Sequence, residues 1–230
     1  MKVRVRFSKH GVMKFIGHLD MMRYFQKALR RAEIPVCLTE GFSPHMVMSF
    51  ASPLGVGLTS DGEYMDIEVK ERIPSREAVA RLNRVMVDGM KVLSYRQIPE
   101  GKASNAMSLV AFADYTVSFR KGKEPSAKWE EKLAEFAALP SILILKKTKK
   151  SEKEVDIKPM IHALSLLENG EIFMRLSSGS ASNLKPELVM EAFTLWLGVE
   201  NPPFSLLVNR VELYDAHMVS LEELGEEIGE

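Results

Sequence analysis

The sequence predicts an α+β protein built from two ferredoxin-like units in tandem, each a βαββαβ arrangement with an antiparallel sheet. The 230-residue chain is long enough for two domains of about 100 residues. Extended and helical segments also follow the same order twice, on either side of a polar stretch rich in turn-forming residues. We expect a first unit over 1–98, a linker over 99–112, a second unit over 113–217 and an acidic tail over 218–230.

The first strand and the first helix are the clearest elements. Residues 1–7, MKVRVRF, alternate charged and apolar side chains, which favours a half-buried strand. Over 18–32 the apolar side chains recur at helical spacing and the charged ones fall on another face, which predicts an amphipathic helix. Pro35 ends this helix because proline does not continue the hydrogen-bond ladder.

A hairpin and a second helix complete the first unit. The stretches 46–51 and 63–69 read as two strands joined by a segment rich in proline and glycine. The next helix opens with Ser75 as its N-cap, and Gly89 stands where a C-terminal cap belongs. The last strand is expected over 91–98. A right-handed crossover then places both helices on one face of the sheet.

The second half repeats the pattern with one extra strand. Asn169 and Gly170 mark the turn between two of its extended segments. The other expected elements are a strand over 114–119, a helix from Ser126 to Pro140, a strand over 142–147, a helix from Pro186 to Gly198, and a final strand over 204–214. The acidic tail is expected to be a frayed helix or disordered.

Composition restricts the function classes. The single Cys37 excludes an internal disulfide, a four-thiolate zinc site and a cysteine-bound iron–sulfur cluster within the chain, and we predict no cofactor and no metal. No apolar run reaches the ~20 residues of a membrane span, and MKVRVRF is unlike a signal peptide, so we expect a cytoplasmic protein without a membrane partner. Lys plus Arg and Asp plus Glu number 31 each, but the basic residues gather at the head and the acidic ones at the tail.

A candidate pocket combines the start of the first helix with the hairpin. Helix N-termini favour anions, and the two corners that frame the first hairpin strand, GFSPH and SPLGVG, let a backbone or a phosphate approach closely. The candidate residues are His18, Asp20, Arg23, His45, Ser49, Glu63, Tyr64 and Asp66. The structural alternatives are an Asp20–Arg23 ion pair, a half-buried His18 and a twisted hairpin with capped ends. The spacing favours neither a metal site nor a nucleophilic triad.

A basic stripe on the first helix is the candidate contact with nucleic acid. Arg23, Lys27, Arg30 and Arg31 share one face of the helix. Lys149 and Lys150, in the run KKTKKSEKEVDIKP at 146–159, are a second candidate phosphate contact. The alternatives are that the stripe docks the acidic tail and that the run is a solvated loop.

Two motifs carry a family resemblance. HGVMKFIGHLDMMRYFQKALRRAEIPV and EGFSPHMVMSFASPLGVGLTSDGEYMDIEV resemble the radical-SAM-linked protein family, specifically over residues 1–70 and more loosely to about 214. In that family the domain is fused to, or encoded beside, a radical SAM enzyme, often near genes for a ribonuclease and ribosomal proteins. This chain has no CxxxCxxC. The resemblance therefore implies an accessory subunit of a separate radical SAM protein, acting on RNA or a ribosome-related substrate.

Three functions follow as hypotheses. The first is this accessory RNA-binding subunit. The second is an RNA-processing enzyme using His18 or His45 as acid or base with Arg23 supporting charge, since the tandem fold also looks like the repeat-associated endonucleases. Here only Gly89 stands where their glycine-rich loop would be. The third is an adaptor that binds only protein through its acidic tail. The sequence does not define an oligomeric state.

Overall fold

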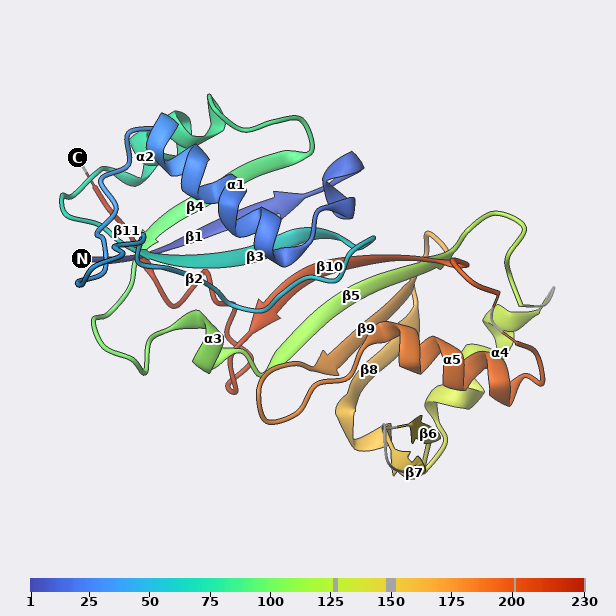
Figure 1. Ribbon diagram of the computed structural model, residues 1–230. Helices are drawn as coiled ribbons and strands as arrows, with labels where there is room; N and C mark the ends of the chain where they lie inside the picture. The colour runs from blue at the N-terminus through green and yellow to red at the C-terminus, as the bar shows by residue number, and fades with distance from the viewer. Residues whose placement is uncertain (126–127, 148–151, 201, 230) are drawn as a thin grey trace. The chain divides into compact units, whose positions relative to one another are not determined.

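The computed structural model describes residues 1–125, 128–147, 152–200 and 202–229 and is an α+β fold in which the strands pair mostly in the antiparallel sense (Figure 1). It divides into two compact units, Met1–Ala111 with Arg210–Glu230, and Phe112–Asn209. The predicted second unit over 113–217 is thus too long at its end. The long strand β10 (Leu206–Tyr214) gives its first four residues to the second unit, whereas Arg210 onward belongs to the first.

The first unit is built on an antiparallel sheet in the order β4-β1-β3-β2. Its strands are β1 (Lys2–Lys9), β2 (Met48–Phe50), β3 (Thr59–Glu68) and β4 (Met90–Gln97). Every neighbouring pair is antiparallel. In this order β3 lies between β1 and β2, and β1 lies between β3 and β4.

One face of this sheet packs against helices. The helix α1 (His18–Arg31) matches the sequence prediction to within one residue and follows a short 3-10 helix η1 (Gly11–Phe15). Because side chains alternate along a strand, every second residue of β1 faces α1, and Phe7 packs on Phe25 with ring centroids 4.6 Å apart. The core lies in this layer.

The second helix starts and ends differently from the prediction. α2 (Ser75–Asn83) has Pro74 at its N-cap, and the Ser75 hydroxyl instead donates to the Tyr95 carbonyl and accepts from the Ile228 amide at 2.8 Å. Gly89 is not its C-cap, because the helix ends at Asn83. Gly89 lies in the turn before β4 with φ +83°, where a Cβ would stand 2.5 Å from the His10 carbonyl oxygen. Glycine is therefore required by a close approach of two backbones.

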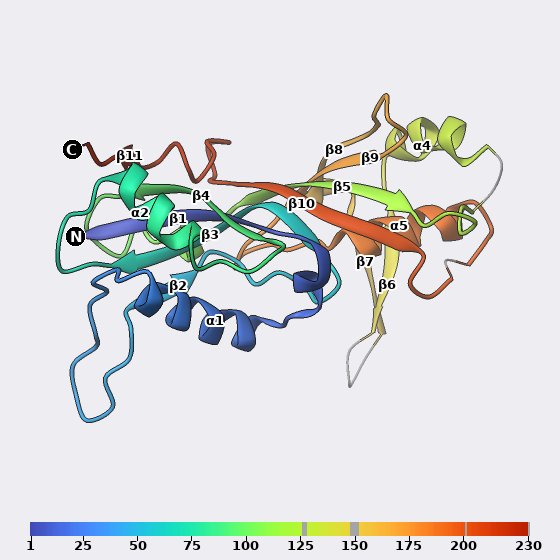
Figure 2. The same ribbon diagram turned by 90° about the horizontal axis from the view of Figure 1, so that it is seen from above.

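The C-terminal segment is folded, which contradicts the prediction of a frayed or disordered tail. Leu221 is fully buried, Ile228 is nearly so, and β11 (Glu226–Glu227) pairs with β4. Figure 2 shows α1 on one side of the strands of the first unit and this segment on the other. Local sequence did not reveal it because its apolar residues are few and its partners lie far away in the chain.

The predicted linker also packs on the first unit. It contains the short helix α3 (Ala106–Leu109), whose Ala106 is buried and donates its backbone N–H to Asp66 at 2.7 Å. The Ser104 carbonyl accepts a hydrogen bond from Arg4 at 2.7 Å. A segment rich in turn-forming residues can thus be ordered when buried charged side chains form hydrogen bonds with its backbone N–H and C=O groups.

The second unit has a sheet in the order β10-β5-β9-β8. Its other strands are β5 (Phe112–Phe119), β8 (Ile161–Leu166) and β9 (Ile172–Ser177), and its helices are α4 (Trp129–Ala137), η2 (Lys158–Met160) and α5 (Pro186–Trp196). The strand predicted over 142–147 is β6 (Leu143–Lys147), which pairs only with β7 (Glu152–Asp156) in a separate two-stranded sheet. Ser126, the predicted cap, lies outside the described residues.

Within the described ranges, every helix is too short or too polar to cross a bilayer.

Candidate nucleic-acid interface

The acidic candidates on β3, Glu63 and Asp66, both form buried ion pairs with arginines. Asp66 accepts two hydrogen bonds from Arg4, at 2.8 and 3.0 Å, in a fork that matches guanidinium geometry. Glu63 is paired in the same way with Arg210, with 2.7 Å between Arg210 Nε and Glu63 Oε1. All four side chains are nearly fully buried. Glu63 and Asp66 therefore neutralise buried cations of the first unit.

Tyr64 is also held by hydrogen bonds inside the first unit. The Tyr64 hydroxyl donates to Glu212 at 2.5 Å and lies 3.3 Å from the Ser220 hydroxyl. Burial raises the pKa of Tyr64, and the neighbouring carboxylate raises it further. Burial also raises the pKa of Glu212. Ser49 stands opposite Asp66 in the β2–β3 ladder. The hairpin thus places Ser49, Glu63, Tyr64 and Asp66 on neighbouring strands, as predicted.

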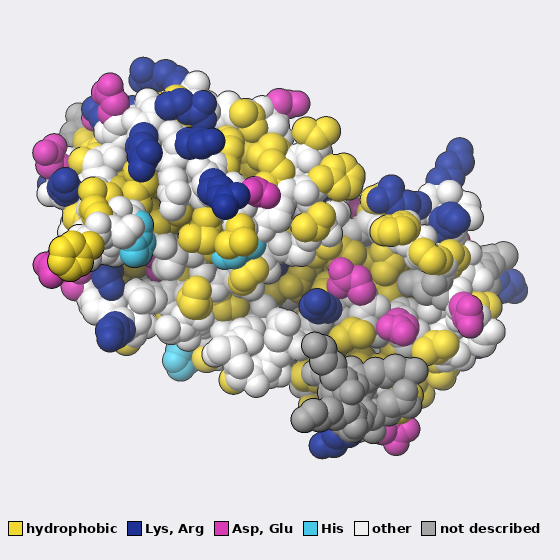
Figure 3. Space-filling view, in the orientation of Figure 1, with side chains coloured by type: hydrophobic (Ala, Val, Ile, Leu, Met, Phe, Trp, Pro, Cys, Tyr) yellow, Lys and Arg dark blue, Asp and Glu magenta, His cyan; other side chains and the backbone are white. Residues whose placement is uncertain are grey.

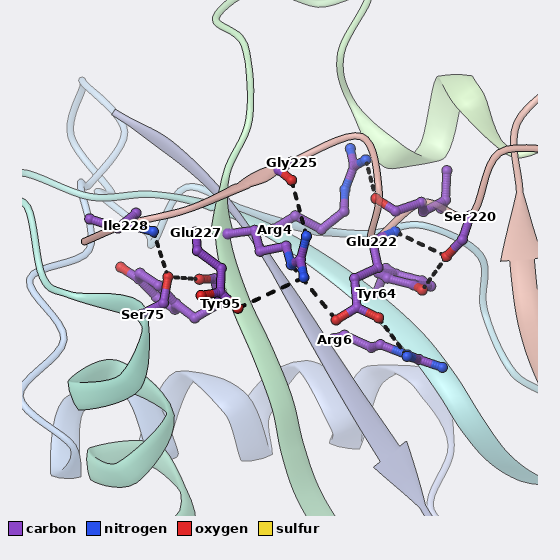
Figure 4. Close-up of polar contacts among 12 residues, drawn as sticks. Arg4, Arg6, Tyr64, Ser75, Tyr95, Ser220, Glu222, Gly225, Glu227 and Ile228 are labelled. Atoms are coloured by element: carbon purple, nitrogen blue, oxygen red, sulfur yellow. Dashed lines mark hydrogen bonds and ion pairs between the residues drawn. The ribbon is translucent and has the colours of Figure 1, made fainter.

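The acidic C-terminal segment pairs with arginines of the sheet (Figure 4). Arg6 binds Glu222 at 2.5 Å and Glu212 at 2.9 Å. Arg96 lies 3.8 Å from Glu222 and 3.9 Å from Glu227. Glu222 and Glu227 are therefore paired with arginines of β1 and β4, on the face of the sheet opposite α1.

The three candidate residues at the start of α1, His18, Asp20 and Arg23, have different surroundings. Asp20 and Arg23 form a surface ion pair at 3.2 Å, one turn apart, as the structural alternative predicts. His18, the first residue of α1, is half-buried and lies edge-on to Phe50, with ring centroids 5.5 Å apart. His18 also lines a small cleft at the helix start.

His45 lies far from His18, so the two histidines do not share a pocket. It is exposed on the loop after Leu38, where its backbone N–H donates to Thr39 Oγ1 at 3.1 Å and its Nδ1 lies 3.1 Å from the same oxygen. This loop leaves the sheet next to the end of α1, since Pro35 bonds to Lys70 beyond β3. His18 is at the other end of a 14-residue helix, a length of about 20 Å. The cleft that His18 lines contains no residue of this loop.

The basic stripe of α1 is exposed along its whole length. Arg23, Lys27, Arg30 and Arg31 are all solvent-exposed, and Figure 3 shows Lys and Arg side chains gathered over α1. Apart from the Asp20–Arg23 pair, these four cations form no ion pair with any residue that the structure describes. Lys149 and Lys150 lie outside the described residues.

The sequence analysis did not identify the arginines that form ion pairs inside the first unit. Arg4, Arg6, Arg96 and Arg210 hold buried or half-buried carboxylates. The alternation in MKVRVRF was the available signal for two of them, because it places Arg4 and Arg6 on the face opposite the helix-packed residues. No local pattern marks Arg210. Residues 1–125, 128–147, 152–200 and 202–229 contain no cluster of three or more His, Cys, Asp or Glu side chains that could hold a metal ion.

Comparisons with known proteins identify a family and a fold. A family model described as "Uncharacterized protein conserved in bacteria (DUF2344)" matches residues 2–186, most of the chain. A chain in the solved structure "Crystal Structure of a Cbf5-Nop10-Gar1 Complex" superposes with a TM-score of 0.51 at 12% identity, over 93% of this chain and 50% of that one. The present chain thus spans about half of that protein, and the likeness concerns the fold alone. No curated protein matches the sequence.

Proposed function

We propose that this chain, which belongs to the bacterial family DUF2344, is an accessory subunit that binds RNA through the basic stripe of α1. One observation carries the proposal: the acidic C-terminal segment binds Arg6 and Arg96 on the sheet. The stripe is therefore left facing solvent, and its positive charge is available to a polyanion. Phosphate contacts of this kind fix position and affinity without reading base sequence.

We further infer that both units are ferredoxin-like. The orders β4-β1-β3-β2 and β10-β5-β9-β8 support this assignment, because each places the fourth strand of a βαββαβ chain beside the first and the third beside the second. The β6–β7 hairpin is then an insertion after the first helix of the second unit.

RNA binding is tested by filter binding with single-stranded RNA at ~50 mM salt, where phosphate contacts are strongest. We expect measurable affinity for the wild type and weaker binding for the Arg30→Ala/Arg31→Ala variant, regardless of RNA sequence. The matched control is Lys121→Ala/Lys123→Ala, which removes the same charge from exposed positions of the second unit. A wild type without RNA affinity would contradict the proposal and favour an adaptor that binds only protein.

The proposed partner is a separate radical SAM protein. Support comes from the motifs over 10–36 and 40–69, which resemble those of radical-SAM-linked proteins. Copurification of the tagged chain from a native host, with bound proteins identified by mass spectrometry, tests this part. We expect a protein carrying CxxxCxxC to be enriched with the wild type, and its absence would contradict the partnership while leaving the RNA test unaffected.

A further inference from the structure

A small cleft opens at the start of α1, within the first unit. It is formed by the end of β1, the first turn of α1 and the Ser52–Pro53–Leu54 corner that follows β2. Phe7, Phe50 and Met21 supply apolar walls, and Lys9, His18 and Glu63 supply titratable groups. The start of α1, at Gly17 and His18, and the SPLGVG corner thus meet at one place. Gly57 holds the corner in position by donating its backbone N–H to the Lys14 carbonyl at 2.7 Å.

Lys9 is the unusual group in this cleft. Lys9 is the last residue of β1, and only 3% of its surface is exposed. Lysine is almost never buried to this extent without a charged partner. An ammonium group has three donors. Among the described residues, Lys9 uses one of them, to the Ile16 carbonyl at 2.8 Å. Two donors of a buried cation therefore remain for something that enters the cleft.

The nearby carboxylate does not balance this charge alone. Glu63 is held on both of its oxygens by Arg210, which also donates to the Ser52 carbonyl at 2.9 Å. Lys9 and Arg210 thus bring two positive charges to one negative charge. Burial lowers the pKa of Lys9, as expected for a cation that lacks a full partner.

The helix adds to the positive potential. The N-cap of α1 is Gly17, which has no side chain to cap the first turn, and Asp20 is turned outward to Arg23. The first backbone N–H groups and the helix dipole therefore favour an anion at the same opening. About 20 Å³ of space is free in the cleft, enough for one oxygen-sized group. A base or a sugar is too large, whereas one oxygen of a phosphate fits.

We propose that this cleft binds the terminal phosphate of an RNA strand, with Lys9 and the first turn of α1 as donors. The inference rests on the proposed function, because the basic stripe begins one turn along the same helix, at Arg23, and leads the strand away from the cleft. The stripe supplies affinity for the backbone. The cleft distinguishes a phosphorylated end from a hydroxyl end.

The test compares RNA oligonucleotides of one sequence that carry a 5′-phosphate, a 3′-phosphate or only hydroxyl ends. We expect the wild type to bind one phosphorylated form about tenfold more tightly than the hydroxyl form, the value of one charge-assisted hydrogen bond. Lys9→Met should abolish this preference and leave binding of the hydroxyl form unchanged. Lys2→Met, the same change at the other end of β1, should keep the preference.

Equal binding of all three RNAs by the wild type overturns the inference without any variant, while the proposed function stands. A preference that persists in a folded Lys9→Met protein also overturns it. If the wild type binds no RNA, the proposed function fails, and inorganic phosphate then tests the cleft by titration calorimetry. Phosphate binding that Lys9→Met removes supports the cleft as an anion site, and no binding overturns it.

Discussion

At the scale of single residues, the first unit depends on charges that are buried in pairs. Arg4 and Asp66 face each other across β1 and β3, and the Ala106 amide supplies a third bond to the carboxylate. Asp20 and Arg23 form the same kind of pair at the surface. The two pairs differ in solvent access, and removing one partner leaves an uncompensated buried charge only in the first.

Asp66→Ala is therefore expected to lower the free energy of unfolding by about 3–5 kcal/mol, whereas Asp20→Ala changes it by less than about 1 kcal/mol. The double change Arg4→Met/Asp66→Leu should cost less than Asp66→Ala, because no charge is left unpaired. Urea unfolding followed by far-ultraviolet circular dichroism measures all three. Equal costs at the two aspartates would show that the buried pair does not support the fold.

Lys9 gives a pH-dependent prediction. Burial lowers its pKa in the folded chain from the ordinary value of 10.5, so the unfolded chain holds this proton more tightly. Stability then rises with pH from the folded pKa up to about 10.5, where the penalty for the buried charge has disappeared. The wild type should gain stability relative to Lys9→Met between pH 7 and 10.5 in urea titrations. A difference between the two proteins that does not change with pH contradicts this account of Lys9.

At the scale of elements, α1 ends in a motif that normally uses glycine. Glu33 has φ +54° and donates to the Arg30 carbonyl, and Ile34 donates to the Leu29 carbonyl, which is the Schellman pattern. A left-handed residue with a side chain costs about 1 kcal/mol. Glu33→Gly should therefore raise the free energy of unfolding by up to about 1 kcal/mol. A loss of stability in this variant, measured by thermal unfolding, would show that the Glu33 side chain makes a contribution that the backbone geometry does not explain.

The C-terminal segment is a structural element of the first unit. Leu221→Ala removes a fully buried side chain and should cost about 2–5 kcal/mol. Leu19→Ala, the same change at a residue that is 68% exposed in the same unit, should stay within about 0.5 kcal/mol. Denaturant unfolding compares them. A cost at Leu221 no larger than that at Leu19 would mean that the segment does not pack as described.

Local elements could be predicted from the sequence, and long-range pairing could not. α1 is fixed by its amphipathic period and by the proline that follows it, so its position was correct to one residue. Side-chain alternation showed which residues of the hairpin share a face of the sheet. It does not show which residue from a distant part of the chain each of them pairs with. Glu63 is paired with a residue 147 positions away, and no local pattern records that distance. The folded tail was missed for the same reason.

At the scale of the whole chain, a net charge of zero does not mean that the charges are evenly distributed. The 31 basic and 31 acidic residues balance in number. Glu222 and Glu227 of the acidic end pair with arginines of the sheet, and the basic residues of the α1 stripe face solvent. Arg6, from the basic head of the sequence, pairs with Glu222 of the acidic tail, whereas the stripe on α1 forms no ion pair with the tail among the described residues. A binding surface can therefore persist in a chain whose net charge is zero.

The salt dependence of RNA binding tests the central claim, which is that the α1 stripe contacts phosphates. The logarithm of the binding constant falls with the logarithm of salt concentration by about 0.7 for each phosphate neutralised on single-stranded RNA. If Arg30 and Arg31 each contact one phosphate, the Arg30→Ala/Arg31→Ala variant should show a slope smaller by about 1.4, while Lys121→Ala/Lys123→Ala keeps the wild-type slope. A slope that is unchanged in the α1 variant contradicts the claim.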